Sequence, residues 1–528
     1  MSAFLLPFPD GLTSLTSGKG VNAKHSEWVD RAMAYFHIDL LAAGGYEIRK
    51  HPQHFLRTRH KEQNDVYLDR ASMMTYQNLI GSAIGWYNAA MFREEWQPVF
   101  KKDGVTLTDS DPNDFYTRFT ANADRAGTTF NSLLATIFET QLKFQHCWVL
   151  TDKPAFDPSQ FANRAEQTAA GANDPYVVLY DPRSVINWDE DELGNLNWAV
   201  TWTTTVQRQF LKAPVTVDRW TYYDRKSFTI YEAERAEGDL QPTEDDSKVK
   251  QIRTGPHALA QVGRVPLRRL SIPKLFWLAN RALPQALDHL NQDNTFRHAL
   301  MMANLPMPAV FGEYDEPVTA SETELNHFPS NTKFEWLEPK GVSFEHSARR
   351  LSTLVEEVYR QFHLQAQGKD SKATASAQSG YSKDMDWKPA NDVLGKFAKW
   401  LRQHGEQILR DVADAHDDAS ITAVVNGTEF DGGSLDAALA THELVEAADI
   451  PSDTLEKVSQ INVAMQVAAD EPDEVQQKIR AEIEAAPTKS ERAEMQQQQA
   501  QQQFGQALDT AINRKQSKLA VTALGGGE

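Results

Sequence analysis

The chain has 528 residues, of which 41% are hydrophobic and 24% are charged, and its formal net charge is −19. This length exceeds what one hydrophobic core usually supports, so we expect about two to four domains. The acidic surplus argues against a protein that coats nucleic acid with a basic surface, but not against one that lets nucleic acid slide past.

No apolar run approaches the roughly 20 residues of a membrane span. The N-terminal sequence MSAFLLPFPDG lacks the basic region and the apolar length of a secretion signal, so we expect a soluble protein that is not exported by this route. Cys147 is the single cysteine, which excludes disulfides within the chain and multi-cysteine zinc sites. Its neighbours Trp148 and Val149 indicate a small, buried side chain.

Helical periodicity dominates residues 1–110. One helix is expected to start with Ser26 as its cap and to end at Gly44-Gly45, and residues 65–92 form a longer amphipathic stretch. Residues 105–150 predict a helix, a turn and a second helix that runs into a short strand.

The period changes over residues 176–232, where β-branched and aromatic residues stand between Gly, Pro, Asp and Asn. This pattern predicts antiparallel strands and hairpins. The acidic run WDEDE at 188–192 is typical of a solvated turn before Gly194, and cation binding is the alternative. His146 and Cys147 are adjacent on a predicted strand, so their side chains should point to opposite faces and not share a catalytic site.

Residues 271–303 give the longest helical pattern, with leucines at helical spacing and an expected length of roughly 45 Å. Pro284 could kink this helix. A short, Pro-rich mixed segment at 304–344 separates it from a second helical pattern at about 345–367. Two long helices around a small insertion make a protruding hairpin.

Three aromatic residues of the first long helical pattern fall outside its main apolar stripe, namely Phe276, Trp277 and Phe296. A hairpin rarely buries all of its apolar surface alone. We therefore expect self-association in a ring to cover these side chains.

The segment KDSKATASAQSGYSK, residues 369–383, places three lysines among small residues and has almost nothing apolar to bury, so we expect a mobile loop. A helical pattern resumes at 391–415. It is followed by a strand with a turn signal at Asn426-Gly427, by acidic amphipathic helices over 434–486 and by a glutamine-rich run at 490–505.

The sequence contains no GxxxxGK[ST] phosphate-binding loop, no HExxH zinc motif and no GxSxG elbow. No pair of carboxyl groups stands out in an apolar setting that would raise the pKa of one of them. We therefore expect that the protein is not an enzyme and has no catalytic residues, no metal site and no cofactor. A hydrolase built from scattered carboxylates is the least favoured alternative.

Several segments together resemble tailed-bacteriophage portal proteins, which form the ring at the packaging vertex of the capsid. The segment YVVLYDPRSVINWDEDELGNL at 176–196 is similar to the family's strand–INW–turn element, and GRVPLRRLSIPKLFWLANRALPQALDHL at 263–290 to its GxxP strand and first stem helix. Weaker echoes lie at 67–92 (R-x5-Y-x-N), 123–154 (D-x-x-G and D-x-P), 339–362 (returning stem helix) and 373–384 (the A-T-A segment). His146-Cys147 departs from the family, which often has Gly at this place.

The resemblance covers most of residues 30–485 and implies an α+β, mainly helical, portal-type ring subunit with wing, stem, clip and crown regions. The implied regions are 1–270 wing, 271–303 stem helix, 304–344 clip, 345–366 returning stem helix, 367–387 tunnel loop, 388–433 wing return helix and strand, 434–486 crown helices and 487–528 low-complexity C-terminal tail.

The resemblance also implies partners and a location. Portal proteins form a homo-oligomer, usually a dodecamer, whose channel passes double-stranded DNA of any sequence during packaging and ejection. The clip would dock the large terminase and later head-completion or adaptor proteins, and the major capsid and scaffolding proteins would be further partners. The subunit would reside at the portal vertex of the virion, and in the host cytoplasm during assembly.

An acidic channel wall would repel DNA and keep it mobile, whereas a few lysines at a constriction would contact phosphates without reading sequence. We therefore predict that Lys369, Lys372 and Lys383, with Lys388 beside them, contact DNA from the tunnel loop. The alternative is that these lysines only keep an exposed loop soluble. A second function also stays open, that of a non-channel oligomeric adaptor or scaffold protein of a viral particle, with the hairpin mediating assembly.

Overall fold

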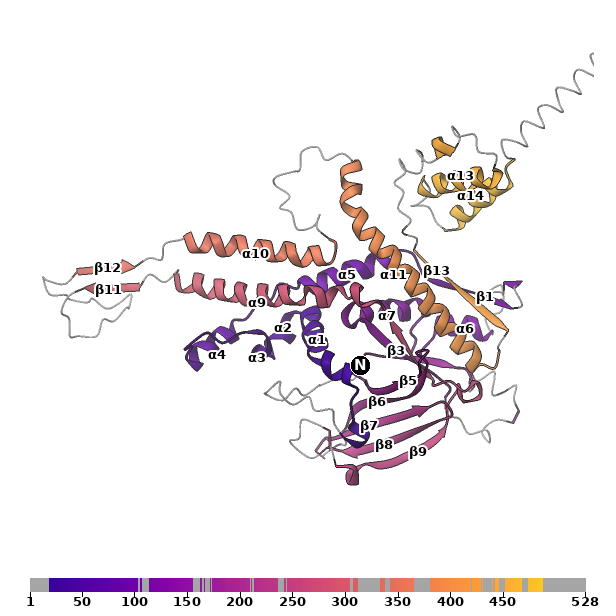
Figure 1. Ribbon diagram of the computed structural model, residues 1–528, viewed down its shortest axis with the longest axis horizontal. Coiled ribbons are helices and arrows are strands. Elements are labelled where there is room, and N and C mark those ends of the chain that lie inside the picture. Colours follow the sequence, from indigo (N-terminus) through magenta and orange to yellow (C-terminus); the bar gives the residue numbers. More distant parts are fainter. Residues whose placement is uncertain are drawn as a thin grey trace, which may run out of the picture. The chain divides into compact units, whose positions relative to one another are not determined.

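The computed structural model describes residues 19–102, 105–106, 114–154, 162–163, 166, 171, 173–208, 210, 213–235, 242–243, 245–303, 307–311, 333–337, 342–364, 380–418, 420–428, 430, 439, 442–445, 452–467 and 473–487. The chain divides into two compact units, residues 1–430 and 431–528. Helices and antiparallel sheets both contribute, so the fold is α+β (Figure 1). Among the described residues, no helix combines the length and the apolar composition needed to cross a membrane.

The first part of unit 1 is helical, as its periodicity predicts. After the 3-10 turn η1 (Gly20–Asn22) it contains α1 (Ser26–Ala43), α2 (Gly45–Arg49), α3 (Pro52–Phe55), α4 (Asn64–Ser72), α5 (Leu79–Met91), α6 (Phe115–Ala121) and α7 (Phe130–Phe144). His25 caps α1 in place of Ser26, because the His25 Nδ1 accepts a backbone N–H at 3.2 Å. The stretch 65–92 is broken in two, because the Asn78 side chain accepts the N–H of Gly81 at 2.8 Å and caps α5.

Longer helices follow in the described parts of both units. Unit 1 contains α9 (Leu278–Ala303), α10 (Val342–Gln361) and α11 (Gly380–Ala415), together with the short 3-10 turns η3 (Asp246–Lys248), η4 (Ala260–Val262) and η5 (Lys274–Phe276). Unit 2 contains α13 (Asp453–Val467) and α14 (Asp473–Ala485), which pack against each other. The glutamine-rich run at 490–505 lies outside the described residues.

The described strands form four sheets. They are β1 (Gln97–Lys102), β2 (Val105–Thr106), β3 (His146–Asp152), β4 (Tyr176–Tyr180), β5 (Val185–Glu190), β6 (Leu196–Gln207), β7 (Val215–Asp224), β8 (Ser227–Glu234), β9 (Lys250–Pro256), β10 (Leu267–Ser271), β11 (Met307–Phe311), β12 (Lys333–Leu337) and β13 (Ile421–Asn426). Strands β5 to β9 form an antiparallel meander, which includes the hairpins predicted over 176–232. The other sheets have the orders β10-β3-β4, β13-β1-β2 and β11-β12.

Two hydrophobic cores support unit 1. The larger core joins the long helices α1, α5, α7, α9, α10 and α11 with β3. Cys147 is fully buried there, as predicted from its apolar neighbours. The second core lies against the five-stranded sheet and is rich in tryptophan, with Trp28, Trp148, Trp188, Trp202 and Trp220 among its members. The long-range pairs β3–β10 and β1–β13 bring remote segments to these cores.

Gly427 follows β13 at a point of very close packing. An ideal Cβ atom on this residue would lie 2.2 Å from the indole of Trp96. That indole is 1% exposed and donates from Nε1 to the carbonyl of Met91 at 2.9 Å. Only a residue without a side chain fits beside a ring held in this way.

We predict that Gly427→Ala lowers the free energy of unfolding by about 1–3 kcal/mol, because the Trp96 ring must shift in a packed core. Urea denaturation of the full chain measures this change. Gly85→Ala is the matched control, since no atom lies within 4 Å of its added Cβ in α5, and it should raise the stability by about 0.5–1 kcal/mol. An unchanged midpoint for Gly427→Ala contradicts the close packing.

Candidate functional site

A helical hairpin, made of α9, the β11–β12 ribbon and α10, stands out in unit 1. Figure 1 shows the two helices side by side and the ribbon beyond their far end. Arg350 Nη2 lies 3.5 Å from Asp288 Oδ2, and the ring centroids of Phe296 and Phe344 are 6.1 Å apart. The two helices are antiparallel, because the contact from the later residue of α9, Phe296, goes to the earlier residue of α10, Phe344.

The first helix of the hairpin begins later than the sequence predicts. Strand β10 pairs with β3 as far as Ser271, and the turn η5 separates it from the start of α9. Residues 271–277 therefore belong to the end of the sheet and its exit rather than to a helix. Pro284 lies inside α9.

A seam of apolar side chains joins the two helices. Ala282 and Ala286 of α9 are fully buried, and Leu354 and Val358 of α10 are at most 1% exposed. The side chain of Arg349, on α10, is 78% exposed. The hairpin thus has an apolar inner face and carries charge outside, as an amphipathic helix pair should.

Aromatic side chains hold the base of the hairpin. Phe276 packs edge-on against Trp400 of α11, with centroids 4.8 Å apart. Trp277 Nε1 donates to the carbonyl oxygen of Lys143 in α7 at 2.8 Å. The argument that a second copy must cover Phe276 and Trp277 is therefore wrong, because two helices remote in the sequence cover them within the chain. Phe296 likewise packs against α10.

Two asparagine amides fasten α9 to the segment around α3 and α4. Asn291 donates to the carbonyl of Phe55 at 2.8 Å and accepts from the N–H of Arg57 at 2.9 Å. Asn294 donates to the carbonyl of Thr75 at 2.8 Å and accepts from its N–H at 2.9 Å. Each amide therefore satisfies one backbone donor and one backbone acceptor that no regular element pairs.

Tyr87 of α5 fastens the end of α10. Its hydroxyl donates to the carbonyl oxygen of Phe362 at 2.5 Å, in a buried setting. Burial raises the pKa of Tyr87, so the hydroxyl keeps the proton that it donates.

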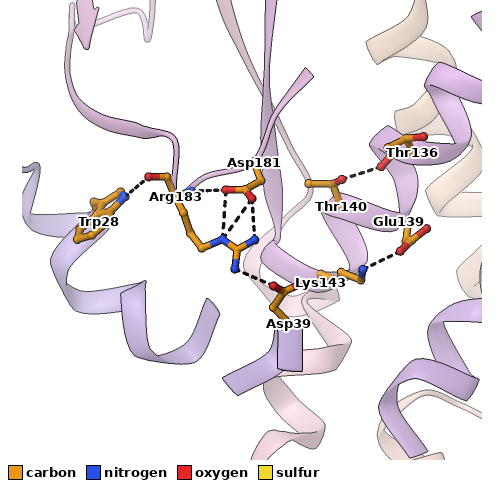
Figure 2. A network of polar contacts seen from close by, with 8 residues as sticks. All are labelled: Trp28, Asp39, Thr136, Glu139, Thr140, Lys143, Asp181 and Arg183. Carbon is orange, nitrogen blue, oxygen red and sulfur yellow. Dashed lines mark hydrogen bonds and ion pairs between the residues drawn. The ribbon is translucent and has the colours of Figure 1, made fainter. Parts of the chain in front are cut away.

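A buried guanidinium links the strands to the helices beside the hairpin base (Figure 2). Arg183 donates to Asp181 and to Asp39 of α1, each at 2.7 Å, and its carbonyl accepts from Trp28 Nε1 at 3.3 Å. Burial by itself lowers the pKa of Arg183, but the carboxylates of Asp181 and Asp39 raise it above its usual value. Figure 2 also shows Lys143, whose carbonyl oxygen accepts the hydrogen bond from Trp277 Nε1 at the hairpin base.

The loop predicted over 367–387 is wrong in its last part, because α11 already begins at Gly380. The helix contains Pro389 and continues without interruption into the part that packs on the core. The sequence did not predict these first turns, because Pro389 indicates a helix boundary and the residues before Gly380 are small and polar.

Two of the four predicted DNA-contacting residues, Lys383 and Lys388, lie in the first turns of α11. The other two, Lys369 and Lys372, lie outside the described residues. The prediction that these lysines contact DNA stays a prediction.

The second half of α11 is tied to β10 and α7. Arg268 Nη2 donates to Asp411 Oδ1 at 2.6 Å, and Arg264 Nη1 lies 3.0 Å from the same oxygen. His404 Nδ1 lies 2.9 Å from Gln141 Nε2. Burial lowers the pKa of His404 to about 4, so at neutral pH the uncharged ring accepts the Gln141 N–H. The second half of α11 is therefore fixed to the core, and the helix continues from it to the turns that contain Lys383 and Lys388.

The chemistry of acidic, histidine and cysteine side chains can be followed in the described residues. They contain no group of three or more His, Cys, Asp or Glu side chains placed to hold a metal ion. After 188–192 the chain turns, with Asp191 Oδ1 accepting the N–H groups of Leu193 and Asn195 at 3.0 and 2.8 Å. Burial raises the pKa of Cys147, which makes its thiol a poor nucleophile.

Sequence reasoning missed the residues that anchor the hairpin. One signal was available, since the stripe of Leu287 and Leu290 continues into Asn291 and Asn294. An amide in place of an expected apolar residue indicates a side chain that bonds buried backbone. No such signal was available for Tyr87, because a tyrosine in an apolar helix is expected to be an ordinary buried core residue.

No family model matches the chain, and no curated protein matches it. Among solved structures, it is similar to a chain in the virion of the native gene transfer agent (GTA) particle, with 11% identity over 76% of this chain and 94% of that chain and a TM-score of 0.37. A chain in the neck of the empty GTA particle, computed with C6 symmetry, gives 10% identity, the same coverages and a TM-score of 0.37. Likenesses of this size do not place the chain in a family.

We predict that Asn294→Ala lowers the free energy of unfolding by about 1–3 kcal/mol, since the Thr75 backbone groups lose their partner in a buried place. Hydrogen exchange of the Thr75 amide should accelerate with it. Thr295→Ala, at an exposed position of the same helix, is the control and should change stability by at most about 0.5 kcal/mol. Protection of Thr75 that survives Asn294→Ala contradicts the anchoring role.

We predict that the protein loses stability as the pH falls from about 6.5 towards 4. The pKa of His404 is lowered to about 4 from 6.5, so over this window the unfolded chain binds a proton that the folded chain does not. At pH 4.5 the effect amounts to about 2–3 kcal/mol. Urea denaturation at pH 7 and pH 4.5 should show a smaller difference in His404→Asn than in the parent protein, and an equal difference contradicts the assignment.

Proposed function

We propose that the chain is a portal subunit of a tailed phage or phage-like particle, forming a ring at the capsid vertex through which double-stranded DNA passes. One observation carries the proposal. The antiparallel α9–α10 hairpin is held at its base by α5, α7 and α11 and bears a two-stranded ribbon at its other end. A hairpin built in this way can line a channel with its helices and present its ribbon to a partner.

The positions of the portal-like segments support the proposal. The strand–INW–turn segment falls on β4 and β5, and the GxxP segment falls on β10, η5 and α9. The D-x-x-G residues make a turn in which Asp124 Oδ1 accepts the N–H groups of Ala126 and Thr128 at 2.8 and 3.0 Å. In the R-x5-Y-x-N pattern, Asn78 is the cap of α5. Several residues shared with the portal pattern therefore have structural roles in this fold, as a helix cap or in a turn.

The proposal assigns a role to each part. The helices and sheets before α9, with α11 and β13, form the wing, and α9 with α10 forms the stem. The β11–β12 ribbon belongs to the clip, which receives the large terminase and later a head-completion or adaptor protein. Helices α13 and α14 form the crown, near the capsid and scaffolding proteins. The protein resides at the portal vertex of the virion and assembles in the host cytoplasm.

The charge balance suggests how DNA moves. With a net charge of −19 per chain, a ring repels the DNA phosphates, so the duplex does not adhere to it. Lysines on and before the first turns of α11 supply brief contacts that depend on salt and not on sequence.

The ring itself is the first test. Negative-stain imaging of the purified full chain should show a ring with a central hole, and the subunits in each ring can then be counted, with a dodecamer expected. A rod or a monomer contradicts the channel and supports the non-channel adaptor or scaffold instead.

The lysines are the second test. Changing Lys369, Lys372, Lys383 and Lys388 to Gln should weaken the affinity of the ring for duplex DNA by about tenfold at moderate salt and reduce the salt dependence of binding. The control changes three exposed lysines of unit 1 to Gln, namely Lys248, Lys250 and Lys274. Unchanged binding and packaging with the fourfold variant contradicts the DNA contact and leaves the ring intact.

A further inference from the structure

The turn between β5 and β6 presents a stiff acidic tip. Asp191 accepts two backbone N–H groups of the turn, and Arg225 Nη2 lies 3.2 Å from Asp191 Oδ2. The exposed carboxylate of Glu192 has no hydrogen-bond or ion-pair partner among the described residues. Leu193 beside it is 87% exposed. The tip therefore offers one free carboxylate and one apolar side chain on a turn that is already ordered.

A groove of about 510 Å³ lies between the β3–β4 strands and one face of the five-stranded sheet. Its floor comes from residues that stand opposite each other on neighbouring strands, in the pairs Thr203–Arg219, Thr221–Ile230 and Ile230–Arg253. Its aromatic lining includes Tyr176, Tyr180, Tyr223 and Phe228. The groove is large enough to receive the tip of a turn.

The groove has one guanidinium available to an incoming anion. Arg253 lies over the Phe228 ring at 5.5 Å and forms no ion pair within 4 Å among the described residues, although its charge acts on the Asp152 carboxylate in the same lining. The other two cations of the lining, Arg219 and Lys153, are each paired with a carboxylate of this chain. Asp152, the one carboxylate of the lining, accepts backbone N–H groups and is partly buried. An acidic, partly apolar segment therefore fits the groove best.

The tip and the groove of one chain do not meet. The turn adjoins β5, at one edge of the sheet, and Arg253 lies on β9, at the opposite edge. Four strand spacings separate these edges, roughly 19 Å, and Arg225 holds the turn where it is. The β5–β6 tip can therefore face Arg253 only in another copy of the chain.

We propose that the β5–β6 tip of one copy docks in the groove of a second copy, with Glu192 facing Arg253 and Leu193 against Tyr176 and Tyr180. A contact between two different patches of one chain can repeat head-to-tail, and it closes a ring when the rotation between neighbouring copies allows closure. This proposal specifies how neighbouring copies in the proposed ring would touch, and it rests on the proposed portal function for the closure of that ring. The exposed Phe210, 93% accessible at the β6–β7 turn, is the weaker occupant, because Arg208 and Lys212 flank it and repel Arg253.

Charge reversal tests the pairing in the full chain. Glu192→Arg alone and Arg253→Glu alone should each raise the protein concentration needed for half-assembly by about tenfold or more. An equimolar mixture keeps one matched pair at each contact between unlike copies, and the double variant matches all of them, so both should restore assembly. Glu95→Arg, an equal change at another exposed site, should have no effect. Mass photometry reads the oligomers, and single variants that assemble like the parent overturn the contact.

A cysteine cross-link separates this contact from the ring. Leu193→Cys combined with Thr203→Cys should give disulfide-linked oligomers on mild oxidation, whereas Leu193→Cys with the exposed Ser72→Cys should not. The native Cys147 is buried and does not interfere. Cross-linked oligomers without a central hole support the contact and contradict the portal ring. Rings without the cross-link overturn the contact and leave the portal proposal standing, and a protein that stays monomeric overturns both.

Discussion

The hairpin depends on the burial of its base. Phe276 and Trp277 lie between α7 and α11, so the first turn of α9 is part of the main core. The two asparagine amides and the Tyr87 hydroxyl then satisfy backbone groups that would otherwise be buried without partners. Removing such a partner costs more than an average hydrogen bond contributes, because the group left behind is desolvated. These few polar contacts therefore help to fix the orientation of α9 and α10 relative to the core.

Charge is distributed in two ways that serve different ends. Inside unit 1, Arg183 is bound by Asp39 of α1 and Arg268 by Asp411 of α11, and these long-range pairs connect the strand-bearing segments to the helices. The proposed functions use other charges: in the proposed channel the net charge of −19 per chain repels DNA, and in the proposed contact Glu192 of one copy faces Arg253 of another.

Much of the secondary structure follows from residue periodicity. The antiparallel hairpins predicted over 176–232 are present, and the amphipathic pattern predicted for the returning helix corresponds to α10. Prediction fails where tertiary packing overrides the local pattern. Residues 271–277 look helical, yet Ser271 pairs with β3, and residues 380–387 look like a loop, yet they extend α11. The anchoring role of Asn294 depends on Thr75, 219 positions away in the chain, so no local pattern could reveal that partner.

The sequence by itself determined the class of the protein: an acidic, cysteine-poor α+β chain with two long helices around a small insertion and no common catalytic motif. These features depend on composition and on periods of two and 3.6 residues, which are local properties. Only the tertiary structure decided what covers the hairpin base, where α11 begins, and that the turn with Glu192 and the strand with Arg253 lie at opposite edges of one sheet. Those facts depend on contacts between segments far apart in the chain, which folding creates and local sequence does not encode.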